Sequence, residues 1–335
     1  MRNRSADIAR ALAALLLIAG HAMAFAAMPQ HWLAGLSHLA TPVFFFLSGA
    51  FISLRLPLRE WLRTRLEALL KPYVVVLLVW AVVHDVSGTI DWYSYLAGML
   101  YGTGRTITIL PLWFLPHLLL VLCCMRLLLL AGQRMRVNER WYWWLVVLLP
   151  VVASPVLQMS APVGGLPWGA DLLLLSLPLL LAGHLLEDRV RQFVPSIPFC
   201  LLAVFAVWLT AQYGGAAIDM NQRLWQSPLA AMLMTAAGVY VVMCLAAWLS
   251  ATGKVSAALA WFGRHTLLVL LFHFLWLRVL FRCLREQGVV VGEGWLVLVW
   301  VACVLLCCAT IAAVQRSRVL SRCLLPSLPG QGARQ

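Results

Sequence analysis

The sequence is poor in charged residues and poorest in acids. Only 11% of its 335 residues are charged, and 12 Asp and Glu stand against 25 Lys and Arg. With 63% hydrophobic residues and a mean hydropathy of +0.90, the composition excludes an ordinary soluble domain. The scarcity of acids also disfavours a transporter that works through paired carboxylates. We therefore predict a membrane protein.

Several catalytic and binding motifs are missing. The chain has no G-x-S-x-G, P-loop, GxGxxG, H-E-x-x-H or aspartate-rich metal loop, so hydrolase, nucleotide-hydrolysing and zinc chemistry have no support and we expect no metal. The nine cysteines form no C-x-x-C pair, and we interpret them as small buried residues. We expect no nucleic-acid partner and attribute the net charge of +13 to membrane orientation and attraction to anionic lipids.

Apolar runs long enough to cross about 30 Å of hydrocarbon recur along the chain. They predict an all-α polytopic bundle of about ten transmembrane helices, folded as a single domain over residues 1–335. A short polar stretch at 91–102 predicts an interfacial or re-entrant segment on the outer side. The predicted spans are 8–28, 36–55, 70–86, 111–131, 141–158, 170–186, 196–213, 228–250, 265–284 and 294–314.

Most Lys and Arg residues fall on one side of this predicted bundle. By the positive-inside rule, their placement predicts that both termini are cytoplasmic and that 315–335 is a short basic cytoplasmic tail. A cleaved signal peptide at the N-terminus is an alternative. Asp7 and an apolar stretch that continues to Met28 argue against it. Three arginines at the outer end of the ninth predicted span or just after it oppose the predicted orientation: Arg278, Arg282 and Arg285.

The first span, "IARALAALLLIAGHAM", carries both Arg10 and His21. Their spacing is close to three helical turns, so both side chains project from one face, about 16 Å apart along the axis. Ionisable groups at such depth are costly unless they face a wet cavity or a partner. Snorkelling of Arg10 and a simple interhelical bond from His21 are the alternatives. Together the two residues favour a polar path through the membrane, and Asp7 is placed to pair with Arg10.

Other segments contain further candidate site residues. An inner loop holds five cations, among them Arg63, Arg65 and Lys71, which are suited to binding phosphates or lipid headgroups. In "HLATPVFFFLSGAF", Ser48 and Gly49 predict close helix packing. His38 begins the same stretch at the outer edge of its span, where it reaches either an outer acceptor site or solvent.

Two more histidines lie within predicted spans. In "PLWFLPHLLL", Trp113 belongs to an aromatic belt or to a sugar-stacking platform, and His117 follows one turn further in. In "FGRHTLLVLLFHFLW", His273 reaches a depth similar to that of His21. A second buried histidine at that depth is what a shared polar site requires.

Seven features along the chain, listed below in their order in the sequence, resemble the acyltransferase-3 family. This family consists of integral membrane O-acyltransferases, which acylate sugars of bacterial surface polysaccharides. The compact length and "LWFLP" are most similar to the fucose 4-O-acetylase-like branch. Ala11 stands where many members carry glycine, and "HLATPVFFF" spaces its histidine and proline differently from a common form. The segments are Asp7; Arg10 and His21 with ten residues between them; "PVFFFLSGAF"; the basic run ending in "KPY"; "PLWFLPHLL"; "LLLAGHLLED"; and "FGRHTLLVLLFH".

This resemblance implies an acetyl-CoA-dependent O-acetyltransferase in the bacterial inner membrane. It would transfer an acyl group from cytoplasmic acyl-CoA to a hydroxyl of a cell-surface glycan or sugar, free or lipid-linked. His21 would act as general base or as a transient acyl-imidazole, and His273 would orient His21 or the acceptor. Arg10 would bind or steer CoA together with Arg63, Arg65 and Lys71.

The residues themselves suggest contacts for the acceptor and two alternative functions. The acceptor would contact His38, Trp113 and His117. A transporter or flippase for a lipid-linked or small polar solute, with the buried His and Arg lining its pathway, is the alternative function. An assembly subunit is a third. The sequence leaves the acceptor, the length of the acyl group and the oligomeric state open.

Overall fold

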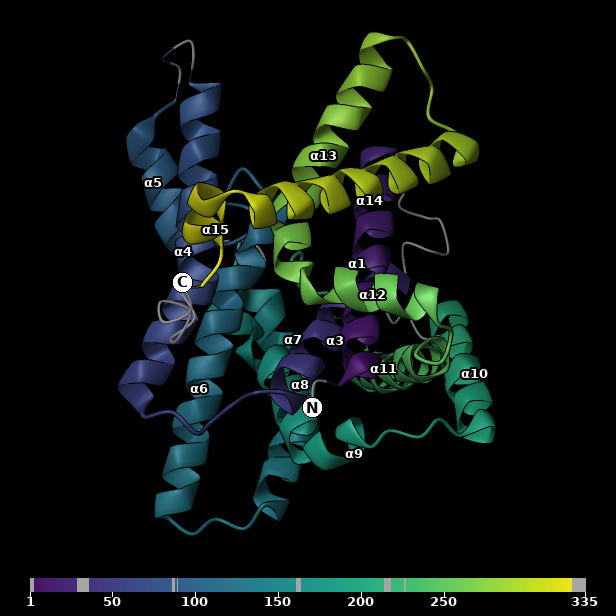
Figure 1. Cartoon of the computed structure of the whole chain (residues 1–335). Helices are drawn as coiled ribbons and strands as arrows, with labels where there is room; N and C mark the ends of the chain where they lie inside the picture. The colour runs from purple at the N-terminus through teal and green to yellow at the C-terminus, as the bar shows by residue number, and fades with distance from the viewer. Residues whose placement is uncertain are drawn as a thin grey trace.

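The computed structural model describes residues 3–28, 36–85, 88, 90–160, 164–213, 218–225 and 227–326, and the described chain is almost entirely helical (Figure 1). Two two-residue strands, β1 (Ile218–Asp219) and β2 (Leu224–Trp225), pair antiparallel. The helices are α1 (Arg4–Phe25), α3 (Ala40–Ala50), α4 (Leu58–His84), α5 (Trp92–Tyr101), η1 (Leu110–Trp113), α6 (Phe114–Arg134), α7 (Arg140–Ser160), η2 (Pro167–Leu172), α8 (Leu173–Leu185), α9 (Glu187–Arg191), α10 (Ile197–Tyr213), α11 (Pro228–Leu249), α12 (Lys254–Arg264), α13 (Thr266–Glu286), α14 (Glu293–Arg316) and α15 (Arg318–Leu324).

The predicted all-α membrane architecture is confirmed in its class. Within the described residues, seven helical segments are long and apolar enough to cross a membrane. The other three predicted spans coincide with shorter apolar helices: Ala40–Ala50, Arg140–Ala153 and Ile197–Thr210. The count of about ten spans and the cytoplasmic placement of both termini therefore stay predictions.

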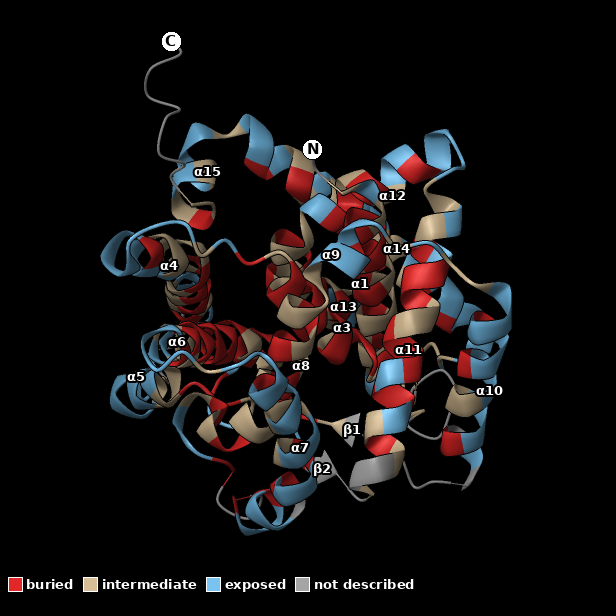
Figure 2. Cartoon of the chain, turned by 90° about the horizontal axis from the view of Figure 1, so that it is seen from below, coloured by how far each residue is buried: buried red, intermediate tan, exposed pale blue. Residues whose placement is uncertain are grey.

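Helix α1 lies at the centre of the molecule. It contacts α3, α11, α12, α13 and α14, and its small residues are buried on several sides, which lets these neighbours approach closely. Asn3 caps its N-terminus by accepting a hydrogen bond from the backbone N–H of Ala6 at 2.9 Å. Figure 2 shows buried residues gathered on α1 and α3, whereas α5 and α10 are largely exposed at the periphery.

Glycines allow close approach at two helix crossings. Gly49 of α3 faces the backbone of Leu180 in α8, and Gly183 of α8 faces the backbone of Phe46 in α3, so that a Cβ on either glycine would overlap the other helix. This reciprocal contact confirms the close packing predicted for Gly49. In the same way Gly263 of α12 lies directly against the backbone of Asp7 in α1.

The C-terminal helices run across the bundle. Figure 1 shows α14 crossing α1 and α13, and Trp300 of α14 donates from Nε1 to the carbonyl oxygen of Leu15 in α1 at 3.1 Å. Helix α15 then docks on α4, where the ammonium group of Lys71 donates to the carbonyl oxygens of Arg322 and Leu325. Part of the predicted basic tail is thus helical, and residues 327–335 lie outside the described residues.

The short polar segment before the fourth predicted span forms α5, whose ten residues are too few to cross a bilayer. Tyrosine hydroxyls tie it to α4: Tyr73 donates to the carbonyl oxygen of Met99, and Tyr95 donates to that of Leu77. A short helix lying against a longer one fits the interfacial or re-entrant segment expected here.

Candidate active site

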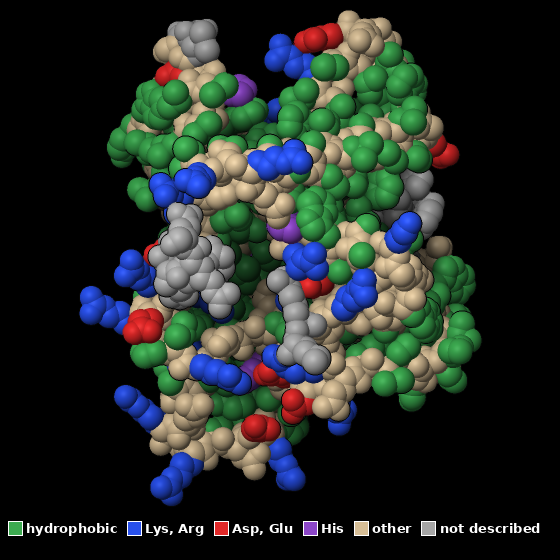
Figure 3. All heavy atoms as spheres, viewed as in Figure 1, with side chains coloured by type: hydrophobic (Ala, Val, Ile, Leu, Met, Phe, Trp, Pro, Cys, Tyr) green, Lys and Arg blue, Asp and Glu red, His purple; other side chains and the backbone are tan. Residues whose placement is uncertain are grey.

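The helices line an open cavity of about 760 Å³. Its wall is built from α1, residues 37–38 and α3, Leu69 of α4, η1, α6 and α13, together with the hairpin of β1 and β2. Four of the predicted site residues line it: Arg10, His21, His38 and Trp113. The face of the molecule in Figure 3 is hollowed in the middle, and most Lys and Arg side chains on that face lie around and below the hollow.

A pair of histidines lies at this cavity. Nδ1 of His21 is 3.0 Å from Nε2 of His273, and the two rings are nearly parallel, with 5.1 Å between centroids. His21 lines the cavity, whereas His273 is fully buried behind it. The structure therefore brings together two histidines that the sequence places in its first and ninth predicted spans.

The hydrogen bonds assign the proton on each ring. Nδ1 of His273 lies 2.7 Å from the carbonyl oxygen of Val269, which can only accept, so this nitrogen carries the hydrogen. Nε2 of His273 then accepts from Nδ1–H of His21. The lone pair of His21 is left on Nε2, and this tautomer is the one that can take a proton from an acceptor hydroxyl.

Packing holds the histidine pair in place. Phe274 packs edge-on against His21 with ring centroids 5.6 Å apart, and Phe25 lies against Phe274 at 5.0 Å. Cys303 of α14 donates from Sγ to the backbone carbonyl of His273 at 3.5 Å. Because residues of α1, α13 and α14 restrain the pair, its geometry depends on how these three helices pack.

Arg10 lines the same cavity and is paired as predicted. Its Nη1 lies 3.0 Å from Oδ1 of Asp7, whose side chain is 3% exposed. The guanidinium also lies over the ring of Phe51, 5.2 Å from the centroid. On the same ring lies Arg191, at 5.0 Å, which sequence reasoning did not identify. Two cations therefore flank one aromatic ring beside the cavity.

The predicted acceptor ligands fall into two groups. His38 and Trp113 lie on the cavity wall, together with the hydroxyl-bearing residues Ser37 and Thr41. His117 lies behind the wall and is fully buried: Nδ1 bonds to the carbonyl oxygen of Trp168 at 2.9 Å, and Nε2 bonds to Oγ of Ser176 at 3.0 Å. A role for His117 in binding the acceptor stays a prediction.

The other predicted phosphate ligands lie on α4 and are not on the cavity wall in the described part of the chain. The side chain of Arg63 is 83% exposed and pairs with Glu67 at 3.2 Å. Arg65 lies over the ring of Trp61, 5.6 Å from its centroid. Lys71 holds α15 as described above. Their contribution to CoA binding stays a prediction.

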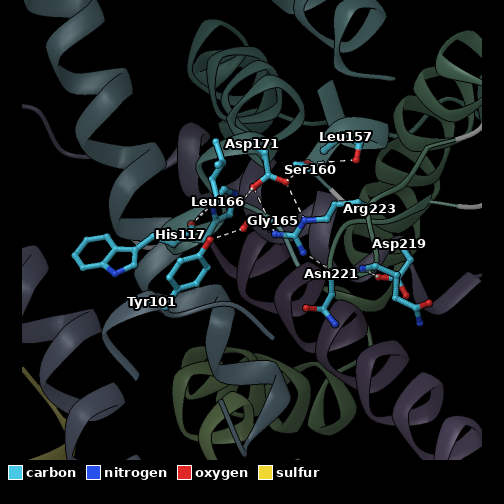
Figure 4. A network of polar contacts seen from close by, with 12 residues as sticks. Tyr101, His117, Leu157, Ser160, Gly165, Leu166, Asp171, Asp219, Asn221 and Arg223 are labelled. Carbon is cyan, nitrogen blue, oxygen red and sulfur yellow. Dashed lines mark hydrogen bonds and ion pairs between the residues drawn. The ribbon is translucent and has the colours of Figure 1, made fainter. Parts of the chain in front are cut away.

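Sequence reasoning missed a buried ion pair beside the cavity (Figure 4). Asp171 of η2 accepts from Nε of Arg223 at 2.8 Å, and the two side chains are 0% and 2% exposed. The same carboxylate accepts from Oγ of Ser160 at 2.8 Å and from the backbone N–H of Leu166 at 2.9 Å. A buried carboxylate needs this many donors to offset its desolvation.

One sequence signal pointed to this pair. Asp171 is an acid inside an apolar run, and such a residue requires a buried partner. Its partner could not be found from spacing, because Arg223 lies 52 positions away in the hairpin.

The acyltransferase-3 family model, described as an acyltransferase domain, matches residues 3–314. The chain belongs to the acyltransferase-3 family. This membership confirms the predicted family and supports membrane acyltransferase activity, with an acyl donor and an acceptor as substrates. No match was found among curated proteins or among solved structures. The fucose 4-O-acetylase-like branch stays a prediction for this acyltransferase.

Proposed function

We propose that this acyltransferase transfers an acetyl group from acetyl-CoA to a hydroxyl of a sugar or cell-surface glycan, free or lipid-linked, at a bacterial inner membrane. The hydrogen-bonded pair of His21 and His273 on a cavity shared with Arg10 is the observation that supports this most directly. The cavity combines Arg10, which can contact a phosphate of the donor, with a basic nitrogen that can activate an alcohol.

The proposed reaction uses His21 as general base. Nε2 of His21 takes the proton from the acceptor hydroxyl as its oxygen attacks the thioester carbonyl carbon. The tetrahedral intermediate collapses, the C–S bond breaks, and the leaving thiolate takes the proton from the imidazolium. The products are the acetyl ester and CoA with a free thiol. His273 holds His21 in the required tautomer and accepts no acyl group.

A two-step route uses the same nitrogen. Nε2 of His21 attacks the thioester, the C–S bond breaks, and CoA leaves as a thiolate. The acceptor oxygen then attacks the acyl group on Nε2, the C–N bond breaks to restore the imidazole, and the acceptor proton neutralises the thiolate through solvent. This route lets CoA depart before the acceptor binds. Trapping of an acetylated His21 with acetyl-CoA alone, detected by mass spectrometry of rapidly quenched protein, distinguishes it from direct transfer.

The donor is proposed to bind at the cationic end of the cavity. Arg10 is already charged and fixed by Asp7, so it offers a preorganised partner for a CoA phosphate. Arg63, Arg65 and Lys71 contribute positive potential from α4, which attracts a polyanionic donor.

The test is release of CoA thiol by purified protein with acetyl-CoA and a panel of methyl glycosides. We expect release that depends on the glycoside, a fall of at least a hundredfold in His21→Ala, and a raised KM for acetyl-CoA in Arg10→Ala. His84→Ala and Arg282→Ala are matched controls, because both residues are exposed and neither lines the cavity.

Two outcomes would contradict the proposal. Full acyl transfer by folded His21→Ala would remove the proposed base. Folded wild-type protein that binds no CoA but moves a radiolabelled solute across vesicles would favour the transporter alternative.

A further inference from the structure

The hairpin at residues 218–225 forms part of the cavity wall, and the proposed mechanism assigns it no role. Four of its residues line the cavity: Asp219, Met220, Asn221 and Gln222. Three of these carry side chains that hydrogen-bond well, on a wall that otherwise consists largely of apolar residues. Polar groups placed on an apolar wall fix the orientation of a ligand and select its type.

The hairpin is held in position from behind. Its ladder joins only two residues on each strand, which is too short to be stable alone. Arg223 fixes it: the guanidinium binds Asp171 of η2 and also donates from Nη1 to the backbone carbonyl of Asn221 at 2.7 Å. The ion pair therefore sets the position of the residue that lines the cavity next to it.

Asn221 has unused hydrogen-bonding capacity. Its Oδ1 is buried and has no hydrogen-bond partner among the described residues. Figure 4 shows its side chain pointing away from Asp171 and the ion pair. The amide lies against Gly104, where a Cβ would collide with it. A buried acceptor without a partner costs free energy, so the amide gains by rotating from Gly104 toward the cavity that Asn221 lines, where a ligand hydroxyl can pair with it.

The charges around the hairpin favour a neutral ligand. The Arg223 side chain is 2% exposed, is paired with Asp171 and is not on the cavity wall, so it does not contact an anion in the cavity. Asp219 adds a carboxylate to the same wall, and this group accepts hydrogen bonds but repels anions. Two amides and a carboxylate, on a cavity that also contains Trp113, match a molecule with several hydroxyls and one apolar face.

We infer that the hairpin forms the acceptor-binding wall of the site, in which Asn221, Gln222 and Asp219 bind the hydroxyls of a neutral polyol. The inference rests on the proposed function, because it assigns the acceptor to the cavity that contains His21. Asp171 and Arg223 are positioning residues, since they act on the ligand only through Asn221.

The test compares acceptor kinetics across a matched set of probes: methyl glucoside, its anionic counterpart methyl glucuronide, and cyclohexanol. Wild-type protein is expected to prefer the glucoside over both. Asn221→Ala and Gln222→Ala are expected to raise the KM for the glucoside about tenfold and leave the KM for acetyl-CoA unchanged. Asp219→Asn keeps an oxygen for the backbone N–H of Gln222, and it is expected to reduce discrimination against the glucuronide.

The control is Gln287→Ala, which truncates an exposed amide that does not line the cavity. An unchanged KM for the glucoside in both Asn221→Ala and Gln222→Ala overturns the inference. If wild-type protein transfers no acetyl group to any probe, the proposed function fails, and the hairpin is then tested by binding. In that case glucoside should raise the melting temperature of wild type but not of Asn221→Ala, and no rise in wild type overturns the inference as well.

Discussion

Nδ1 of His21 hydrogen-bonds to Nε2 of His273 across 252 positions of the chain. The bond joins α1 to α13 at the cavity, and the backbone of α13 sets its direction through the carbonyl oxygen of Val269. Helix α13 therefore sets which nitrogen of His21 is basic, although His21 itself belongs to α1. This dependence means that His273 can be tested separately from the base.

Replacing His273 should lower the turnover rate without weakening the binding of either substrate. In His273→Ala, Nδ1–H of His21 loses its acceptor and the ring can change tautomer, so we expect kcat to fall about tenfold to a hundredfold at unchanged KM. In His273→Gln, the amide oxygen can still accept from His21, and part of the loss should be recovered. If His273→Gln lost as much kcat and as much melting temperature as His273→Ala, the role of His273 would be packing alone.

The sequence predicted which residues line the cavity better than it predicted the number of membrane-spanning helices. Arg10 and His21 could be assigned to one helix face because their separation in the sequence is about three turns of a helix with 3.6 residues per turn. Their arrival at one cavity, together with His38 and Trp113, follows from three segments that each had to be placed at membrane depth. The helix count was harder, since α3, α7 and α10 contain apolar stretches that fall short of a full crossing.

Residues whose role depends on distant partners could not be assigned from spacing. The prediction that His117 binds the acceptor rests on its position one turn after Trp113, and its two nitrogens bond to Trp168 and Ser176. The prediction that Lys71 helps to bind CoA rests on its place in a basic run, and its ammonium holds the end of α15. In both cases the contact that defines the side chain comes from a segment far along the chain.

The effects of replacing the exposed Arg63 and the cavity-lining Arg10 should depend differently on salt concentration. Arg63 is 83% exposed, so its attraction for a polyanionic donor acts at long range and is screened within about 10 Å at 0.1 M salt. We expect Arg63→Ala to lower kcat/KM for acetyl-CoA severalfold in dilute buffer and to have no effect at about 0.5 M NaCl. The effect of Arg10→Ala should persist at high salt. A salt-independent effect of Arg63→Ala would indicate direct contact with CoA.

Close packing at Gly263 should be required for the geometry of Arg10. A methyl group there would overlap the backbone of Asp7, and overpacking of this kind costs about 1–3 kcal/mol. Gly263→Ala is therefore expected to lower the melting temperature in detergent and to raise the KM for acetyl-CoA. Gly294 provides the matched control, because nothing lies within 4 Å of a Cβ there. Gly294→Ala should be neutral or slightly stabilising, and equal effects of the two changes would rule out the proposed contact.

The ion pair of Asp171 and Arg223 should show strong non-additivity. Removing one partner leaves a buried charge uncompensated, which costs about 3–5 kcal/mol, whereas replacing both with apolar residues is often tolerated. We therefore expect Asp171→Leu and Arg223→Met each to lower the melting temperature by more than the double variant does. The double variant still lacks the bond from Arg223 to the carbonyl of Asn221, so its stability should recover while its KM for the acceptor stays raised. Recovery of both would show that the pair only stabilises the fold; recovery of stability alone would show that it also positions Asn221.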